Sequence, residues 1–441
     1  MGFLDELRAV VPVSEAPASA DRSGATGDGP PLAIARPDTV DGVRTAVRLA
    51  SAHGVPVVPR GAGTGLAGGA VAGRGELVLD VSGLDRIVEI DPVDAVAVVE
   101  PGVRTAALDR AAQEFGLRYA PDPASAKIST IGGNIATNAG GMRCVKYGVT
   151  RDAVLGLDVV LADGRLISTG RRTVKGVSGL DLTSLFVGAE GTLGVVVGAT
   201  LRLRPLPART LTAAAAYDSV AAAARACAEL TRQRREPSLL ELLDGATLEV
   251  IDRAQGTDLA TRGRALVIAQ ADGPSADEEI TAIAKVLAEE ATGSEHAVDP
   301  ESSERLLFAR RMALPSIERF GRALIEDICV PRSRLAEAFE GVARIAAAHD
   351  VRIHTFAHAG DGNLHPIVSY DGPLTSEVHH AGDDLFSLAL DLGGTVTGEH
   401  GIGLLKRNWL AREVGPDVLD VHTAIKTALD PRGILNPGKG F

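Results

Sequence analysis

The sequence predicts an α+β protein built from two main units, and three observations support this prediction. Short apolar strand segments alternate with amphipathic, Ala-rich helical segments along the chain. Two glycine-rich blocks, at residues 61–75 and 131–148, interrupt the alternation only in the N-terminal half. Pro205 and Pro207 stand where the texture of the sequence changes, as at a domain boundary. A chain of 441 residues is long enough for two or three cores.

The N-terminal half is expected to begin its regular structure with a helix capped by Asp38 or Thr39 and ended by Gly54. The Asp163-Gly164 pair predicts a tight hairpin turn between two strands. Further strands are expected at 55–59, 76–82, 95–102 and 194–205, with a helix at 104–115 that ends at Gly116.

The C-terminal half also alternates strands with helices, and its helices are rich in alanine. Strands at 264–270 and 323–331 are separated by Ala-rich helices at 275–291 and 334–349. Two further helices are expected near the C-terminus, after the segment Gly-Glu-His-Gly-Ile-Gly.

Composition excludes several classes of function. The formal charge of −12 and the pI near 5.4 do not suit a protein whose main partner is nucleic acid. Cys144, Cys227 and Cys329 lie far apart without a C-x-x-C pair, so neither a disulfide framework nor a thiolate metal site is expected. No apolar run reaches the ~18 residues of a membrane span, and the first residues do not resemble a signal peptide. A cytoplasmic protein is the expectation.

The first glycine-rich block contains Gly63, Gly65 and Gly68 in the spacing of a dinucleotide-binding fingerprint. In a Rossmann site such glycines open a helix, whereas here the block leads into another strand, which disfavours a nicotinamide enzyme. Glycines can instead direct successive backbone N–H groups at one anion, as a diphosphate requires. A flexible surface loop is the alternative. The second block adds hydrogen-bonding side chains for a polar planar ligand, namely Thr130, Asn134, Thr137 and Asn138.

A second motif is a histidine hairpin. If Asp361-Gly362 forms a two-residue turn, His358 and His365 are directly opposed on one face of the sheet. Their Cβ atoms would be roughly 4.5–5.5 Å apart, so that both imidazoles could reach one divalent ion. Glu399, between glycines, could supply a third ligand. The alternative is that both histidines are ordinary hydrogen-bonded residues of a turn.

Three segments, 59–70, 121–141 and 188–196, resemble the PCMH-type FAD-binding domain of the vanillyl-alcohol oxidase superfamily. The resemblance covers nearly the whole chain and is nearest to D-lactate dehydrogenases, D-2-hydroxyglutarate dehydrogenases and the flavin subunit of glycolate oxidase. It implies a two-lobed FAD-binding domain at 1–207 and an α/β, ferredoxin-like substrate or cap domain at 208–395. A C-terminal helical segment, 396–441, would return to the FAD domain.

The resemblance also implies which residues hold FAD. Some superfamily members attach the flavin through a histidine in the first loop, but Thr64 stands in that neighbourhood here, so non-covalent FAD is expected. The implied cofactor-binding residues are Arg60, Gly61, Ala62, Gly63, Thr64, Gly65, Gly68, Gly69, Pro121, Asp122, Ser125, Thr130, Gly133, Asn134, Thr137, Gly140, Gly141, Tyr147, Gly148, Glu190, Gly191, Gly194, Val195 and Asn436.

The histidine hairpin and the Gly-Glu-His-Gly-Ile-Gly segment resemble the metal-binding and catalytic segments of the same dehydrogenases. By this resemblance His358, His365 and Glu399 hold a divalent metal, with zinc as the expected ion, and His400 is the base. Arg310 occupies the place of an arginine that binds the substrate carboxylate, and neighbouring Arg311 could have this role instead. The alternative is that both arginines are solvent-exposed charges on a helix. Just before the segment Asp-Ile-Cys-Val-Pro, family members often have a lysine or a small polar residue, whereas this chain has Ile325 and Glu326.

The expected function is FAD-dependent oxidation of a small 2-hydroxy acid, of the D-lactate, glycolate or D-2-hydroxyglutarate type, to the 2-oxo acid by hydride transfer to flavin N5. A quinone, a cytochrome, an electron-transfer flavoprotein or oxygen would accept the electrons, and a homodimer is left open. The alternatives are a flavin oxidase or lactone dehydrogenase of the same superfamily and a non-catalytic flavin subunit that only passes electrons.

Overall fold

The computed structural model describes residues 2–15, 21–297 and 299–441, and the chain divides into two compact units. Unit 1 consists of Met1–Gly141, Gly148–Leu206 and Glu399–Phe441. Unit 2 consists of Met142–Tyr147 and Pro207–Gly398. The chain therefore enters unit 2 twice, once for a short segment and once for a continuous stretch.

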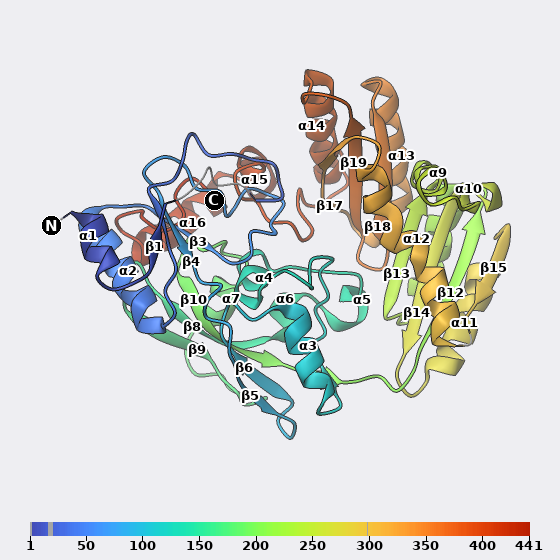
Figure 1. Ribbon diagram of the computed structural model, residues 1–441. Helices are drawn as coiled ribbons and strands as arrows, with labels where there is room; N and C mark the ends of the chain where they lie inside the picture. Colours follow the sequence, from blue (N-terminus) through green and yellow to red (C-terminus); the bar gives the residue numbers. More distant parts are fainter. Residues whose placement is uncertain (1, 16–20, 298) are drawn as a thin grey trace. The chain divides into compact units, whose positions relative to one another are not determined.

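The first lobe of unit 1 is a small sheet with two helices. Strands β2 (Ala33–Ala35), β4 (Leu77–Asp80) and β3 (Val57–Arg60) are parallel, and β1 (Val13–Ser14) is antiparallel at the edge. Helices α1 (Phe3–Arg8) and α2 (Val40–His53) lie side by side (Figure 1). As the sequence predicts, Thr39 caps α2 by accepting the Gly42 N–H, and Gly54 ends it with φ of 68°.

The second lobe of unit 1 is an antiparallel sheet in the order β5-β6-β10-β8-β9. Its predicted hairpin is confirmed, because β8 and β9 are joined through the Asp163-Gly164 turn. The strands are β5 (Ile87–Asp91), β6 (Val96–Val99), β8 (Val154–Val160), β9 (Leu166–Gly170) and β10 (Val195–Arg202), and β7 (Leu117–Arg118) pairs with β11 (Arg204–Pro205) nearby; the helices are α3 (Thr105–Gln113), α4 (Ile131–Thr137), α6 (Thr150–Ala153) and α7 (Leu182–Phe186).

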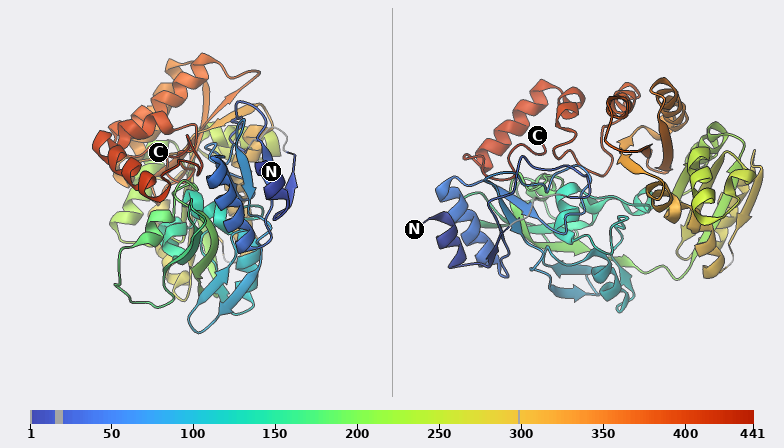
Figure 2. Two further views of the ribbon diagram at one scale, coloured as in Figure 1. Left: turned by 90° about the vertical axis from the view of Figure 1, so that its left-hand side faces the viewer. Right: turned by 45° about the horizontal axis from the view of Figure 1, so that its top comes forward.

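The C-terminal segment completes unit 1. Helices α15 (Arg407–Val414) and α16 (Pro416–Leu429) pack against each other (Figure 2). The chain then runs beside β3, where the Val57 N–H donates to the Ile434 carbonyl at 2.7 Å and the Asn436 N–H donates to the Val57 carbonyl at 2.8 Å. Ile434 and Leu435 are buried in the core of the first lobe, so the last residues of the chain are structural parts of this unit.

Unit 2 is built on one antiparallel sheet in the order β15-β12-β14-β13-β18-β19-β16, with β17 also paired to β19. Its first four strands have the order of a ferredoxin-like βαββαβ motif, and the last three repeat that order without the fourth strand. The strands are β12 (Thr210–Tyr217), β13 (Leu239–Asp244), β14 (Ala265–Asp272), β15 (Gly293–His296), β16 (Arg322–Ile325), β17 (Ile328–Cys329), β18 (Arg352–His358) and β19 (Asn363–Tyr370).

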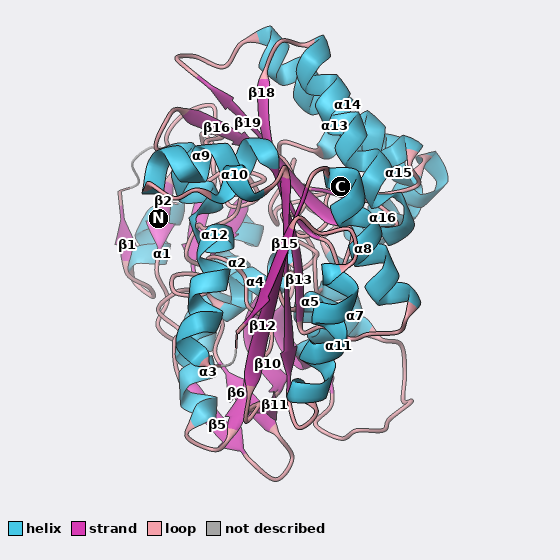
Figure 3. Ribbon diagram, turned by 90° about the vertical axis from the view of Figure 1, so that its right-hand side faces the viewer, coloured by secondary structure: helices cyan, strands magenta, loops and turns pink. Residues whose placement is uncertain are grey.

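Helices cover both faces of this sheet (Figure 3). One face carries the crossover helices of the two motifs, α8 (Val220–Arg232), α11 (Ala276–Ala288), α13 (Leu335–Ala348) and α14 (Ser376–Asp391). The other face carries the helices inserted between strands, α9 (Gly245–Gln255), α10 (Leu259–Arg262) and α12 (Pro300–Glu318), while the short α5 (Cys144–Tyr147) contacts β13. The two motifs meet where β13 pairs with β18.

Within residues 2–15, 21–297 and 299–441, none of the helices combines the length and the apolar character that a bilayer crossing needs. The three cysteines are free thiols, with Cys227 buried in α8.

Because Asp244, the N-cap of α9, is buried, we expect the stability of the protein to depend on pH. Burial raises its pKa from 3.8 to about 6, although the N–H groups of Thr247 and Thr355 donate to it. The folded state therefore binds a proton more tightly than the unfolded state between these values, and unfolding becomes harder as the pH falls through this window. Relative to Asp244→Asn, we expect the free energy of unfolding of the native protein to rise by on the order of 2 kcal/mol between pH 7 and pH 4. Denaturant titrations of both proteins measure this difference, and a difference that does not change with pH would contradict it.

Candidate active site

The first glycine-rich loop connects β3 to β4 in unit 1 without an intervening helix, as the sequence predicts. Gly63 and Gly68 have φ of 67° and 80°. A Cβ at Gly61 would lie 2.3 Å from Thr130 Oγ1, and one at Gly63 would lie 2.6 Å from an Arg60 guanidinium nitrogen. The loop is thus a closely packed cradle that only glycine permits, which is how proteins bring backbone N–H groups to a phosphate.

The second glycine-rich block contains α4, which sequence reasoning did not identify as a helix. Thr130 caps it by accepting the Gly133 N–H at 3.3 Å. Asn134 is buried and donates to Thr105 Oγ1 at 2.7 Å, while Thr137 Oγ1 donates to the Gly133 carbonyl at 3.4 Å. The side chains expected to face a ligand are therefore engaged in part by the protein, and the N-terminus of α4 lies beside Gly61 of the first loop.

Two further segments of unit 1 approach each other closely. A Cβ at Gly141 would come within 2.5 Å of the Asp122 carbonyl oxygen, so the backbones at these two residues are in contact. A Cβ at Gly191, which has φ of 72°, would come within 3.0 Å of Pro59 in β3. The candidate cofactor segments at 60–69, 121–122, 130–141 and 190–191 thus belong to one unit and are packed through glycine.

Glu190 and Asn436 tie the C-terminal segment to this region. The buried Glu190 carboxylate accepts the N–H groups of Ile402 at 2.6 Å and Gly403 at 2.8 Å. Burial raises the pKa of Glu190 in spite of these two hydrogen bonds. Asn436 Nδ2 donates to the carbonyls of Gly69 at 2.9 Å and Glu190 at 2.7 Å, and its Oδ1 is buried without a partner in the described structure.

Other candidate cofactor residues have different surroundings. Gly194 is packed against Val159 at the start of β10, next to Val195. Ser125 accepts the Ser129 N–H through its carbonyl. Tyr147 belongs to unit 2, where its hydroxyl donates to Asp272 at 2.7 Å. The structure therefore groups most of the expected flavin residues in unit 1 and assigns Tyr147 to the other unit.

The predicted register of the histidine hairpin is wrong by two residues. His358 pairs with Asn363, and His365 pairs with Phe356. The connection is longer than a two-residue turn, because the N–H groups of Asp361 and Gly362 both donate to the His358 carbonyl. His358 and His365 are diagonal neighbours on the same face, and their ring centroids are 5.1 Å apart. The two imidazoles are therefore adjacent, as expected, by a different geometry.

Glu241 on β13 is the central acidic group beside His358. Its side chain is fully buried and directly opposes His358 across the β13–β18 pair. Glu241 Oε1 is 2.6 Å from His358 Nδ1, and Oε2 accepts from Arg310 Nε. Burial by itself would raise the pKa of Glu241, but its interactions with His358 and Arg310 outweigh burial, and the pKa lies below its ordinary value.

Arg310 and Arg311 have opposite environments on α12. Arg310 is 12% exposed, and its guanidinium lies 4.2 Å from the centroid of the Phe356 ring. Arg311 is 49% exposed and forms an ion pair with Glu304. Only Arg310 of these two thus lies on the face of the sheet that carries both histidines.

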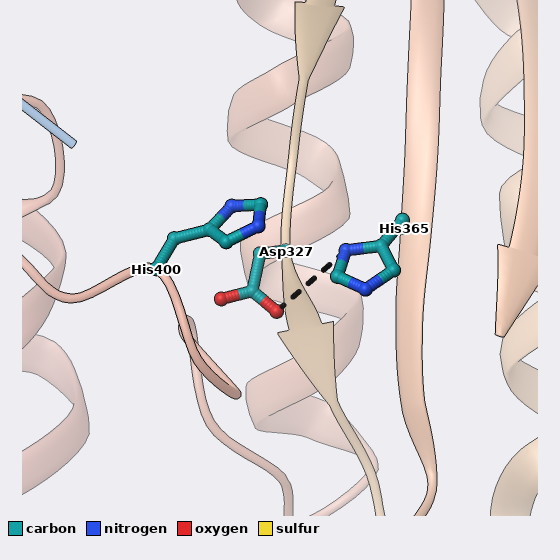
Figure 4. Close-up of side chains that lie close together, drawn as sticks. All are labelled: Asp327, His365 and His400. Carbon is teal, nitrogen blue, oxygen red and sulfur yellow. Dashed lines mark ion pairs between the residues drawn. The ribbon is translucent and has the colours of Figure 1, made fainter. Parts of the chain in front are cut away.

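Asp327 is a second buried carboxylate, beside His365 (Figure 4). It accepts from Asn363 Nδ2 at 2.6 Å and from Thr397 Oγ1 at 2.8 Å, and its Oδ1 is 4.0 Å from His365 Nδ1. Each histidine therefore has one carboxylate next to its Nδ1.

Glu399 and His400 follow Gly398, the last residue of unit 2, by one and two peptide bonds. Their side chains are 17% and 12% exposed. Glu399 and His400 begin the last segment of unit 1, whereas His358, His365 and Asp327 belong to unit 2.

Sequence reasoning missed Glu241, Asp327 and Asn363. A signal for Glu241 exists, because a lone carboxylate interrupts the apolar strand Leu-Leu-Glu-Leu-Leu. Its partner on α12 lies 69 positions away, so no local pattern could identify the pair. Asp327 follows Ile325 and Glu326, the residues that differ from the family pattern. Ile325 pairs with Ile367 and packs in the core.

Two family models match the chain. Residues 31–170 match an FAD binding domain, and residues 206–440 match the C-terminal domain of FAD linked oxidases. The second match covers more than half of the chain.

Relatives with assigned names match over nearly the full length. Glycolate oxidase subunit GlcD of Bacillus subtilis (strain 168) is 43% identical over 420 residues, which cover 93% of this chain and 89% of that protein. The subunit of the same name from Escherichia coli (strain K12) is 34% identical, with 93% and 84% covered. D-lactate dehydrogenase of Archaeoglobus fulgidus is 36% identical, with 100% and 99% covered.

Solved structures share the fold at low sequence identity. p-Cresol methylhydroxylase with substrate bound has a TM-score of 0.79 and 18% identity over 99% of this chain and 96% of its own. 4-Ethylphenol oxidase from Gulosibacter chungangensis has a TM-score of 0.78 and 20% identity over the same shares. The two domain matches and the full-length relatives together show that the chain belongs to the FAD-linked oxidases and is an FAD-dependent oxidoreductase.

Proposed function

We propose that the protein oxidises a small 2-hydroxy acid, of the glycolate, D-lactate or D-2-hydroxyglutarate type, to the 2-oxo acid. The observation that carries this proposal is the cluster on one sheet face of unit 2, where Arg310 and His358 share the carboxylate of Glu241 and His365 lies next to His358. A carboxylate next to a hydroxyl is the substrate that such a set of groups can bind. The names of the relatives, glycolate oxidase subunit and D-lactate dehydrogenase, support the same class.

Unit 1 would hold FAD without a covalent bond. The residues that line its cradle include no histidine in the first loop, where Thr64 stands. The buried, unpartnered Oδ1 of Asn436 and the closely packed glycines fit a polar ligand that approaches the backbone. When bound, the flavin would accept the two electrons that leave the substrate. Residues 60–69, 130–141 and 190–191 and Asn436 would bind and orient it.

His358, His365 and Glu399 would hold a divalent ion, for which two imidazoles and a carboxylate are the donor set of zinc. The contact of His358 fits this role, because a metal-binding histidine commonly donates its other ring N–H to a carboxylate such as Glu241. Such an ion would act as a Lewis acid toward the substrate. An electron acceptor outside this chain would complete the turnover.

Arg310 would bind the substrate carboxylate. Glu241 occupies its Nε, and no hydrogen bond in the described part of the chain uses its two terminal nitrogens. Two parallel N–H groups are what bidentate recognition of a carboxylate requires. His400 would accept the hydroxyl proton, since a neutral imidazole is the side chain that most often serves as a general base.

Flavin binding tests the cradle. In Gly141→Ala the added methyl group would meet the Asp122 backbone at 2.5 Å, so the two segments must separate. We expect FAD to bind about tenfold more weakly or worse, because overpacking of this kind costs about 1–3 kcal/mol. Flavin absorbance per protein and FAD titration of the apoprotein measure the loss. Gly83→Ala is the matched control, because its Cβ would lie 3.5 Å from Pro37, an ordinary contact; equal flavin affinity in the two variants would refute the prediction.

Metal binding tests the histidine cluster. His365→Ala and, separately, Glu399→Gln should lower the content of tightly bound divalent ion and the turnover rate by at least about tenfold, with the flavin spectrum unchanged. His379→Ala, which removes an exposed histidine of α14, should change neither quantity. Elemental analysis and dye-linked assays measure both effects. Full activity and metal content in His365→Ala and Glu399→Gln would rule out the metal assignment.

A substrate screen tests the reaction class. With an artificial dye as acceptor, we expect reduction by one or more of glycolate, D-lactate and D-2-hydroxyglutarate, and the corresponding L-acids serve as stereochemical controls. Arg310→Lys should raise KM for the acid by at least about tenfold, because lysine replaces a bidentate fork with a point charge. Arg311→Lys should leave KM unchanged. A protein that is yellow but inert to every 2-hydroxy acid would contradict the proposed substrate class.

A further inference from the structure

Glu241 is an unusual residue for its position. It lies in the middle of β13, between leucines that pack in the core, and its side chain has no exposed surface. A carboxylate in such a place costs several kcal/mol unless charged or hydrogen-bonding partners surround it. An apolar residue at this place in the strand would not need such partners, so the carboxylate points to a role beyond folding.

The two oxygens of Glu241 have separate partners. Oε1 lies 2.6 Å from Nδ1 of His358, and Oε2 accepts from Nε of Arg310. The first contact places the His358 proton on Nδ1 and so leaves Nε2 as an acceptor. The second contact fixes the inner edge of the guanidinium and leaves its two terminal nitrogens for another anion.

Phe356 supplies the third constraint on this arrangement. It lies on the same face of β18 as His358, and its ring centroid is 4.2 Å from the Arg310 guanidinium carbon. The same ring is 5.5 Å from His365. Arg310 is thus held at its edge by Glu241 and along its flat side by Phe356, while Glu241 itself is held by the strand backbone.

We propose that Glu241 is a positioning residue that sets, with one rigid carboxylate, both the tautomer of His358 and the direction of Arg310. This inference rests on the proposed function, in which His358 binds a divalent ion and Arg310 binds the substrate carboxylate. The two groups that receive the substrate are thereby fixed relative to each other by a residue that touches neither substrate nor cofactor. A small 2-hydroxy acid would be recognised by its two adjacent oxygen functions rather than by its length.

The test is Glu241→Gln in the full-length holoprotein. The amide keeps one acceptor oxygen, but its NH₂ group turns a donor toward a donor, so His358 or Arg310 loses its partner. We expect the Kd for zinc, measured by chelator competition, and KM for the 2-hydroxy acid to rise by about tenfold or more together. FAD affinity should not change. Asp244→Asn is the matched control, because Asp244 is on the same strand but accepts from Thr247 and Thr355, away from His358 and Arg310.

A double variant separates positioning from simple loss of stability. If Glu241 acts on KM through Arg310, then Glu241→Gln combined with Arg310→Lys should have the KM of Arg310→Lys alone. Multiplied effects would show that the two residues act independently and would overturn the coupling. Unchanged zinc Kd and KM in a folded, flavin-bound Glu241→Gln protein would overturn the proposal as a whole.

Failure of the proposed function gives a different result. In that case the native protein itself would lack a tightly bound divalent ion or would not oxidise any 2-hydroxy acid. Failure of the positioning role appears only when the native protein has both properties and Glu241→Gln retains them. Thermal unfolding of each variant, followed by circular dichroism, shows whether a loss of affinity accompanies a loss of fold.

Discussion

The ion-paired carboxylate of Glu241 is the constraint around which the candidate site of unit 2 is arranged. A fully buried negative charge requires compensating partners, and here they are an imidazole and a guanidinium from two other elements. Because β13 belongs to the first ferredoxin-like motif and β18 to the second, the charge also joins the two motifs at their shared edge. The position of the site thus follows from strand pairing together with electrostatics.

Unit 1 uses a different physical device. Its cradle contains several glycines whose missing Cβ atoms allow close approach of a neighbouring backbone or side chain. Gly61 against Thr130, Gly141 against Asp122 and Gly191 against Pro59 are contacts that any larger residue would break. A site of this kind recognises a cofactor through backbone N–H groups, which lets the diphosphate be bound without a strongly basic surface. This agrees with the acidic composition of the chain.

Much of this organisation could be predicted from the sequence, because it depends on local patterns. The cap at Thr39, the end of α2 at Gly54 and the Asp163-Gly164 turn depend on residues close together in the chain. The hairpin register was wrong because Asp-Gly also fits longer turns, and the backbone here folds Asp361 and Gly362 back onto the His358 carbonyl. The short helix α4 was missed because two glycines lower its helix propensity, while the Thr130 cap and the packing of Ile131 and Ile135 stabilise it.

The motif residues of the candidate site could be predicted from the sequence, but the carboxylates that contact them could not. The residues of the two short motifs, His358, His365, Glu399 and His400, carry a chemical pattern that the sequence displays. Glu241 and Asp327 do not, because each meets its histidine only after strands distant in sequence are paired. The choice between Arg310 and Arg311 likewise depends on which side of α12 faces the sheet, and the structure turns Arg310 toward Glu241 and Arg311 toward Glu304.

The inserted helices explain why a ferredoxin-like scaffold can carry this chemistry. In a simple βαββαβ motif one face of the sheet is covered by the crossover helices, and the other face must find another partner. In unit 2 that second face is covered by α9 and α12, which are additions to the repeated motif. Arg310 comes from one of these additions, whereas Glu241 and both histidines come from the strands beneath it. The sheet therefore fixes Glu241 and both histidines, and the inserted helix α12 supplies the arginine that pairs with Glu241.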